Sequence, residues 1–182
     1  MVPAESIASD LDQILAGSRD GDRFAQRKLY ERYHRTVYGL AVRLVGRCEA
    51  DDLTQEIFLR VFAGLSSFRG TSGFSTWLYR VAVNECLRYR RAARPMPDTL
   101  AREPAARDGT PDRRFEQAEA LESALQQLEP SLRCVFLLRH GEGMDYKKIS
   151  AVLGIPISTA ATRLSRARAE LQRLLKGVMQ GS

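Results

Sequence analysis

Cysteine, histidine and tryptophan are scarce in this chain of 182 residues, which holds three, two and one of them. The cysteines are far apart and odd in number, so they indicate no disulfide framework. Each is expected to be a small buried side chain in a reducing compartment; they are Cys48, Cys86 and Cys134. His34 and His140 are distant in sequence from the cysteines and from each other. The sequence therefore predicts no metal site.

Long apolar runs are also missing. No stretch approaches the roughly 20 apolar residues that span a bilayer. The opening MVPAESIASD lacks the basic start and apolar core of a signal peptide, so we expect a cytoplasmic protein with no membrane insertion. No segment alternates as a half-buried strand does, whereas apolar residues recur at helical spacing throughout. The sequence therefore predicts an all-α fold.

Charge is unevenly distributed along the chain. The formal net charge of +6 favours a polyanionic partner. Residues 75–94 hold five arginines and one acid, and residues 145–182 hold seven Lys or Arg and two acids. Residues 49–56, in contrast, hold four acids and no base. Two basic segments and one acidic segment indicate more than one macromolecular partner.

Proline is concentrated between two helical regions. The segment Pro95–Pro111, PMPDTLAREPAARDGTP, holds four of the seven prolines and shows no apolar periodicity. We assign residues 95–113 to a flexible or extended linker. It joins two small helical domains, residues 9–94 and 114–178, each near the lower size at which a core sustains itself.

The first region is predicted to contain a short helix at 9–16, a long helix that Gly46 ends, and a third helix over 48–65. The apolar side of the long helix is expected to comprise Phe24, Leu29, Tyr33, Val37, Leu40, Ala41, Leu44 and Val45. The third helix has a buried stripe at spacing four: Leu53, Ile57, Val61 and Leu65. This stripe leaves its acids on an outer face.

That outer face holds Asp52, Gln55 and Glu56. The helix dipole accounts for the acids of the first turn, Glu49 and Asp51, but poorly for Gln55 and Glu56. The alternative is a docking surface for a basic partner. From the residues alone, both interpretations stay open.

A glycine-containing loop, SSFRGTSGF, follows, with two aromatic residues that are expected to be exposed, Phe68 and Phe74. Ser75 or Thr76 is expected to cap the next helix. Three polar residues share one face of that helix: Arg80, Asn84 and Arg88. Aromatic rings beside an arginine-lined helix suit single-stranded nucleic acid, where unpaired bases stack while the backbone follows positive charge. In the simpler interpretation, the arginines complement the helix dipole; Trp77 belongs to the core in either case.

The second region begins with a helix at 115–128, with Leu121, Leu125 and Leu128 in register, and then a helix capped by Ser131. The apolar residues of SLRCVFLLRH are core by default, although some could form a groove for a partner. A helix-turn-helix follows. Asp145 is placed to cap a helix over 146–153, and Gly154 supplies the positive φ that ends it. Pro156 prevents immediate continuation, and Ser158 is expected to cap the second helix.

That second helix has two distinct sides. One is predicted to be apolar except for an arginine: Leu164, Arg168, Leu171, Leu174, Leu175 and Val178. The opposite side carries short hydroxyls and arginines: Thr159, Thr162, Ser165, Arg166 and Arg173, with Arg163 on its flank. Such a side suits the DNA major groove, with the arginines on phosphates or guanine. An ordinary surface helix with solvated arginines is the alternative.

Three segments, in this order, resemble bacterial alternative sigma factors of the extracytoplasmic-function (ECF) type in the sigma-70 family. They are DDLTQEIFLRVF, SFRGTSGFSTWLYRVAVNECLRYRR and the helix-turn-helix ending IPISTAATRLSRARAEL. The resemblance covers nearly the whole folded chain. It implies sigma region 2 over residues 9–94 and sigma region 4 over 114–178, in a protein that binds RNA polymerase core and directs promoter-specific transcription initiation. It also implies no enzymatic activity, no catalytic residue, no metal and no cofactor.

The resemblance assigns roles to the candidate residues. Docking on the clamp helices of the polymerase β′ subunit falls to Asp52, Gln55 and Glu56. Opening of the −10 element and holding of an extruded base falls to Ser67, Phe68, Arg69, Phe74, Arg80, Asn84 and Arg88. Region 4 is implied to dock on the β flap and to read the −35 element as duplex, with Thr159, Thr162, Arg163, Ser165 and Arg166 as candidate contacts. An anti-sigma factor is a further implied partner.

Two other functions compete with this interpretation. A stand-alone helix-turn-helix regulator accounts for residues 145–175 but leaves the acidic helix and the aromatic loop without a role. A metal-dependent hydrolase could use Asp51, Asp52 and Glu56, since carboxylates bind magnesium. It is disfavoured because no His or Lys accompanies these carboxylates and no phosphate-binding loop is present.

Overall fold

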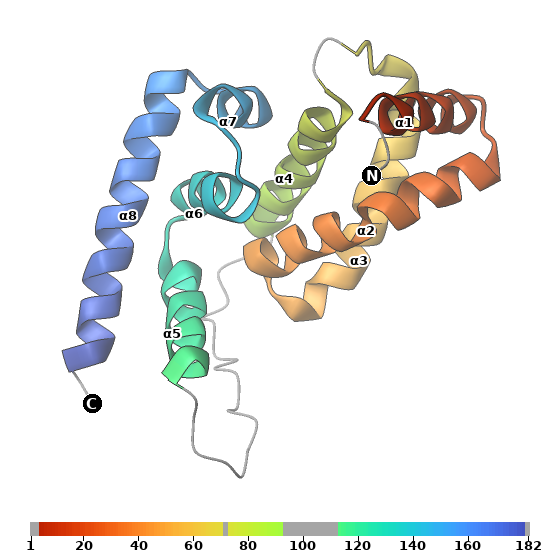
Figure 1. Ribbon diagram of the computed structural model, residues 1–182. Coiled ribbons are helices and arrows are strands. Elements are labelled where there is room, and N and C mark those ends of the chain that lie inside the picture. Colours follow the sequence, from red (N-terminus) through yellow and green to blue (C-terminus); the bar gives the residue numbers. More distant parts are fainter. Residues whose placement is uncertain (1–3, 71–72, 93–112, 181–182) are drawn as a thin grey trace. The chain divides into compact units, whose positions relative to one another are not determined.

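The computed structural model describes residues 4–70, 73–92 and 113–180 (Figure 1). Over these residues the chain forms eight α-helices, a short 3₁₀ turn and a π-turn, with no strand. The all-α prediction is therefore confirmed. The predicted linker, residues 95–113, lies outside the described residues except for Arg113. The contacts divide the chain into two compact units, an N-terminal unit formed mainly by residues 1–86 and a C-terminal unit formed by most of the residues that follow.

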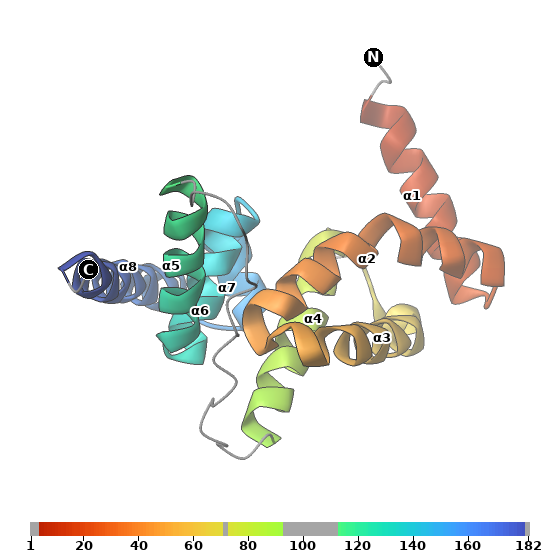
Figure 2. The same ribbon diagram turned by 90° about the horizontal axis from the view of Figure 1, so that it is seen from below.

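The N-terminal unit is built on helix α2 (Arg23–Val45), which packs against both α1 (Ala4–Arg19) and α3 (Arg47–Gly64) (Figure 2). Helix α1 is longer at both ends than the predicted 9–16. Asp22 caps α2 by accepting a hydrogen bond from the Phe24 amide at 2.8 Å. Gly46 ends α2 as predicted, at a φ of 102° that favours glycine.

The predicted stripe of α3 forms the centre of this core. Leu53, Ile57, Val61 and Leu65 are all buried, as predicted. Helix α2, which packs against α3, contributes buried residues that include Leu29, Leu40 and Leu44. The prediction for Phe24 is wrong, because 66% of this residue is exposed. Its neighbour Ala25 takes the core position, and the Lys28 ammonium instead lies 4.8 Å from the Phe24 ring centroid.

Helix α4 (Phe74–Ala92) follows the 3₁₀ turn η1 (Leu65–Ser67), and its residues up to Cys86 complete the N-terminal unit. It begins earlier than predicted. The Gly73 carbonyl accepts the amide protons of Thr76 and Trp77, at 2.9 and 3.3 Å, so Ser75 and Thr76 lie inside the first turn and do not cap it. A backbone carbonyl thus starts the helix where a side-chain cap was expected.

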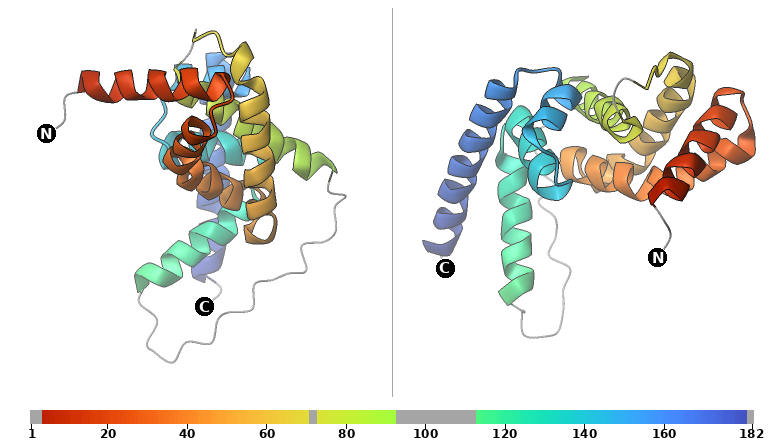
Figure 3. Two further views of the ribbon diagram at one scale, coloured as in Figure 1. Left: turned by 90° about the vertical axis from the view of Figure 1, so that its right-hand side faces the viewer. Right: turned by 45° about the horizontal axis from the view of Figure 1, so that its top comes forward.

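The C-terminal unit contains α5 (Arg113–Gln127), α6 (Pro130–Phe136), the π-turn η2 (Leu137–Gly141), α7 (Tyr146–Leu153) and α8 (Ile157–Gln180). Helices α5 and α6 both pack along α8 (Figure 3). Leu125 and Leu128 are buried as predicted, but Leu121 is 38% exposed. The predicted Ser131 cap is wrong: Glu129 caps α6, and its carboxylate accepts the Ser131 amide at 3.1 Å. Pro130 fits the first helical position because it lacks an N–H and its φ is preset.

Two of the three cysteines follow the prediction. Cys86 and Cys134 are buried, and burial raises the pKa of the Cys134 thiol to about 12, so that it is neutral and unreactive at physiological pH. Cys48 is exposed, because it lies in the first turn of α3 on the side away from the buried stripe.

The corner between α5 and α6 is held by a fully buried arginine. Arg133 is 0% exposed, and its guanidinium donates to the Gln126 side-chain oxygen at 2.7 Å, to the Gln126 carbonyl, and to the Leu128 carbonyl at 3.3 Å. These are carbonyls at the end of α5, which have no partner within the helix. A single charged side chain of α6 therefore fixes the end of the preceding helix.

Replacing Arg133 by methionine keeps the length of the side chain and removes its donors. We expect the C-terminal unit to lose about 3 kcal/mol of unfolding free energy, because buried acceptors lose a charged partner. Urea unfolding of the full chain, followed by circular dichroism, measures this loss. Arg173→Met is the matched control, since Arg173 is exposed and pairs only with Glu170 in the described contacts; its effect should stay below about 0.5 kcal/mol. Equal losses for the two variants would show that Arg133 does not stabilise this corner.

Candidate protein and nucleic-acid interfaces

Helix α3 presents its acids outward because its opposite side is buried. Asp52 and Gln55 are exposed and Glu56 is partly exposed, so the three predicted docking residues lie together on one accessible face. The sequence pattern did not point to Leu59, which is 69% exposed one turn beyond Gln55. An exposed leucine beside carboxylates provides an apolar contact within a charged face, which is a typical composition for a protein interface.

Arg60 connects this acidic face to α4. Its guanidinium contacts Glu56 at 3.2 Å and Glu85 at 2.9 Å. The Glu85 side chain is only 11% exposed, so this contact is more shielded from solvent than the contact with Glu56. Glu85, the single acid of the basic segment 75–94, therefore faces α3 and leaves the outer side of α4 positive.

The loop after α3 is organised by aromatic contacts. Phe68 is partly buried, and its ring centroid lies 5.7 Å from that of Phe74, edge to face, and 5.4 Å from that of Trp77. The expectation that Phe74 is exposed is wrong: it is 5% exposed because it opens α4 on its inner side. The buried Phe74 ring thus packs against Phe68 on the α4 side and presents little surface to a ligand. The Ser67 hydroxyl donates to the Gly64 carbonyl at 2.7 Å, and Arg69 is exposed.

The outer face of α4 carries the predicted polar residues. Arg80, Asn84 and Arg88 are all exposed at spacings of four. Trp77 is partly buried and lies against Gly64, where a Cβ atom would approach its Cζ2 atom to 3.3 Å. A half-buried aromatic loop therefore belongs to one unit with the exposed Arg80 and Asn84, and Arg88 lies one turn farther along the same helix. This combination suits single-stranded nucleic acid.

The first helix of the helix-turn-helix, α7, begins and ends as predicted. Asp145 caps α7 by accepting the Lys148 amide at 2.7 Å, and Gly154 ends the helix with a φ of 64°. The Ser150 hydroxyl donates to the Ile155 carbonyl at 2.5 Å and so braces the turn. The predicted Ser158 cap is wrong: α8 begins at Ile157, and the Pro156 carbonyl accepts the first amide, from Ala160 at 3.0 Å.

The faces of α8 are rotated slightly from the prediction. Its buried stripe consists of Ala160, Leu164, Ala167 and Leu171. Arg168 is exposed, and its guanidinium donates to His140 Nε2 at 3.2–3.4 Å. Burial, followed by the nearby charges of Arg168 and Arg139, lowers the pKa of His140, so the ring is neutral at neutral pH and accepts this bond. The buried side of α8 therefore contains Ala160 and Ala167, whereas the prediction had placed Arg168 there.

The predicted DNA side of α8 is accessible. Thr162, Ser165 and Arg166 are exposed, and Thr159 and Arg163 are partly exposed. The Thr162 hydroxyl donates to the Ser158 carbonyl at 2.9 Å, which orients it along the helix. Arg173, farther along, contacts Glu170 at 2.9 Å.

The described residues contain neither a membrane-spanning helix nor a metal-binding cluster. Within those ranges, none of the helices combines the length and apolar content that crossing a bilayer requires. In the same part of the chain, no three His, Cys, Asp or Glu side chains gather closely enough to hold a metal ion.

Comparison with known families assigns both units. The model of sigma-70 region 2 matches residues 29–95, and the model of sigma-70 region 4 matches residues 118–171. The chain is 34% identical to the ECF RNA polymerase sigma-E factor of Haemophilus influenzae, over 88% of this chain and 93% of that protein. This chain belongs to the sigma-70 family as an ECF sigma factor. The region 2 match accounts for the acidic helix and the aromatic loop, which a stand-alone helix-turn-helix regulator leaves unexplained.

Solved structures of sigma factors share its fold. CnrH, solved in complex with the cytosolic domain of CnrY, aligns with a TM-score of 0.67 and 27% identity over 90% of this chain and 96% of that chain. The sigma factor RpoE of Bartonella quintana, solved with the anti-sigma factor NepR, aligns with a TM-score of 0.62 and 26% identity over 82% of this chain and 96% of that chain. Sigma factors are DNA-binding regulatory proteins that bind RNA polymerase and promoter DNA, and this sigma factor directs transcription initiation.

The shielded contact between Arg60 and Glu85 should contribute to the stability of the N-terminal unit. Glu85→Gln removes the charge at nearly constant shape, and we expect a loss of about 1–2 kcal/mol in urea unfolding. Glu56→Gln removes the other, more exposed partner of the same arginine and should cost less than about 0.5 kcal/mol. A larger loss for Glu56→Gln than for Glu85→Gln would contradict this assignment.

Proposed function

We propose that this sigma factor divides its work between two domains, region 2 over residues 9–94 and region 4 over 114–178, joined by a linker at 95–113. Region 2 docks on the clamp helices of the polymerase β′ subunit and opens the −10 element. Region 4 reads the −35 element as duplex and docks on the β flap. The supporting observation is the segregation of charge between neighbouring helices of the chain, with exposed carboxylates on α3 and exposed arginines on α4.

Docking falls to Asp52, Gln55 and Glu56, with Leu59 beside them as an apolar anchor. A carboxylate face attracts a basic partner and steers its approach, while a buried leucine slows dissociation. The clamp helices would cover both kinds of side chain. Arg60 fixes one edge of this face through Glu56.

Promoter opening is a binding process in this proposal and needs no catalytic residue, metal or cofactor. Unpairing and extruding a base costs a few kcal/mol, which stacking and charge contacts with the open strand offset. The contacts come from Ser67, Phe68 and Arg69 in the loop and from Arg80, Asn84 and Arg88 on α4. Phe74 acts indirectly, since its buried ring supports Phe68. The phosphodiester chemistry belongs to the polymerase, so the protein itself is not an enzyme.

Region 4 would place α8 in the major groove. Thr159, Thr162 and Ser165 are short enough to let the helix backbone approach base edges, and Arg163 and Arg166 reach phosphates or guanine. An anti-sigma factor is the further partner, because the similar sigma factor RpoE of Bartonella quintana was solved in complex with the anti-sigma factor NepR. The protein would act in the cytoplasm, where the polymerase and the promoter are found.

Run-off transcription with bacterial core polymerase, from the promoter of the chain's own operon, tests the whole proposal; no transcript above that of core alone would overturn it.

The docking face can be tested by a double substitution. Asp52→Ala with Gln55→Ala should weaken binding to core polymerase by about tenfold or more, because both side chains are exposed on the proposed interface. Fluorescence anisotropy of labelled full-length chain against core polymerase measures the affinity, and circular dichroism checks the fold. Glu31→Ala is the control, since it removes an exposed acid from α2 whose described partner is Arg27. Unchanged affinity in the double variant would remove the docking assignment.

Contact between α8 and phosphate can be tested through salt. Arg166→Ala in the polymerase complex should lower affinity for −35 duplex and reduce the slope of log affinity against log salt by about one unit. Arg173→Ala is the comparison, because Arg173 already contacts Glu170 farther along the same helix. A salt slope equal to that of the unmodified protein would show that Arg166 does not contact phosphate.

A further inference from the structure

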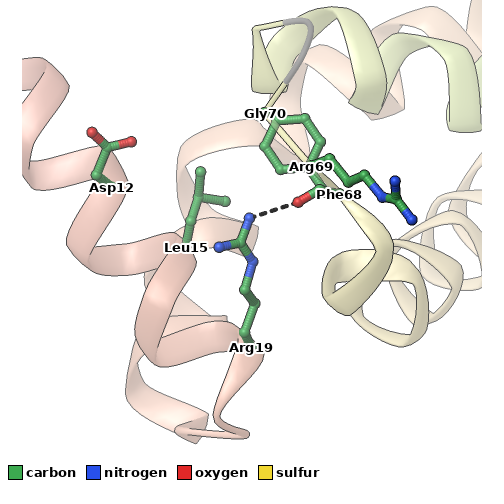
Figure 4. Close-up of a pocket in the computed structure, with 6 residues that line it drawn as sticks. All are labelled: Asp12, Leu15, Arg19, Phe68, Arg69 and Gly70. Carbon is green, nitrogen blue, oxygen red and sulfur yellow. Dashed lines mark hydrogen bonds between the residues drawn. The ribbon is translucent and has the colours of Figure 1, made fainter.

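Arg19, in the last turn of α1, makes contacts that no sequence pattern indicated. A basic residue at the end of a helix usually complements the helix dipole. Here the side chain crosses to another segment. Its Nε donates to the Leu65 carbonyl at 3.2 Å. Its Nη2 donates to the Phe68 carbonyl at 2.9 Å, the bond drawn in Figure 4. Leu65 and Phe68 lie 46 and 49 residues beyond Arg19 in the sequence.

The two acceptors define the turn that carries Phe68. Leu65 begins η1, and Phe68 follows it with extended backbone (φ −71°, ψ 106°). The planar fork of one guanidinium spans both carbonyls, so it fixes the start and the end of the turn relative to each other. Its carbon also lies 5.8 Å from the centroid of the Phe68 ring.

The Phe68 ring is thus held from two directions. Phe74 and Trp77 contact it from the α4 side, and Arg19 lies over it from the α1 side. Helix α1 and the loop also form the walls of a cavity of about 600 Å³, which Asp12, Leu15, Arg19, Phe68, Arg69 and Gly70 line (Figure 4). Arg19 joins the two walls by hydrogen bonds, and so sets their separation.

We propose that Arg19 is a positioning residue for promoter opening, which ties the Phe68 loop to α1 and holds it ordered before DNA arrives. The inference rests on the proposed role of this loop at the −10 element. A loop that is already ordered loses less conformational entropy when it captures an open strand, so capture is stronger. Helix α1 then contributes to strand opening through Arg19.

The positioning can be measured without polymerase, because Trp77 is the only tryptophan of the chain and lies beside Phe68. In the full-length protein, Arg19→Ala should red-shift the Trp77 emission and raise its quenching by acrylamide, with an unchanged far-ultraviolet circular dichroism spectrum. Arg27→Ala, which removes an exposed arginine from α2, should alter neither quantity. An Arg19→Ala spectrum identical to that of the parent protein would overturn the positioning role.

The functional consequence is measured with core polymerase on the promoter of the chain's own operon. Arg19→Ala should lower the permanganate reactivity of the −10 region about tenfold, the factor that corresponds to the loss of charged hydrogen bonds. Closed-complex formation in a gel-shift assay should stay within twofold of the parent. Equal losses in both assays would overturn the inference, since they would indicate a general defect in folding or docking.

Two further variants separate charge from geometry and this inference from the proposed function. Arg19→Lys keeps the charge but not the planar fork, and it should open promoters as poorly as Arg19→Ala; full activity would show that charge alone matters and would overturn the positioning role.

Phe68→Ala should lose opening and retain closed-complex formation. Loss in Phe68→Ala with normal opening in Arg19→Ala would overturn the inference and leave the proposed function standing. Normal opening in Phe68→Ala would overturn the role of the loop itself.

Discussion

Burial of one stripe of α3 determines how the N-terminal unit presents its chemistry. Leu53, Ile57, Val61 and Leu65 are all buried against α2 and its neighbours. Burying an apolar side chain of this size contributes about 1.5–3 kcal/mol. Rotating α3 about its axis would expose Leu53, Ile57 and Val61, so the helix has one stable orientation. Asp52 and Gln55 face solvent as a consequence of that orientation.

The same constraint acts on α8 in the C-terminal unit. Its stripe of Ala160, Leu164, Ala167 and Leu171 packs against α5 and α6. Two of these residues are alanines, which bring the backbones close together. Arg133 fixes the corner of α5 and α6 against which α8 rests. The exposed side with Thr162, Ser165 and Arg166 is therefore held by contacts on the opposite side of the helix.

The aromatic loop depends on a few specific contacts with α1 and α4 and has no buried stripe of its own. Its position depends on ring contacts among Phe68, Phe74 and Trp77 and on the guanidinium of Arg19. The ring contacts join residues that are close in sequence, whereas Arg19 reaches Phe68 from 49 residues away. In the proposed role, a loop held in this way is ordered before its ligand arrives, which lowers the entropy cost of capturing a base from an opening duplex.

The sequence by itself determined the elements whose cause is local. Helical spacing of apolar residues predicted all-α structure and the buried stripe of α3, and Asp145 and Gly154 marked both ends of α7 because capping and positive φ depend on neighbouring residues alone. Three sequence segments, in their order along the chain, indicated the ECF family. Errors arose where a competing local group took the role: Glu129 capped α6 in place of Ser131, and the Pro156 carbonyl opened α8 in place of Ser158.

Only the tertiary structure decided which aromatic residue of the loop is buried and what holds it. Phe68 and Phe74 look alike in sequence, but α4 begins at Phe74 and turns that ring inward. Arg19 appeared as an ordinary basic residue beyond the predicted short helix, yet its partners lie 46 and 49 residues away. The physical reason is that long-range hydrogen bonds and ring contacts depend on how helices pack together. That packing leaves no periodicity or short motif at the residues that it brings into contact.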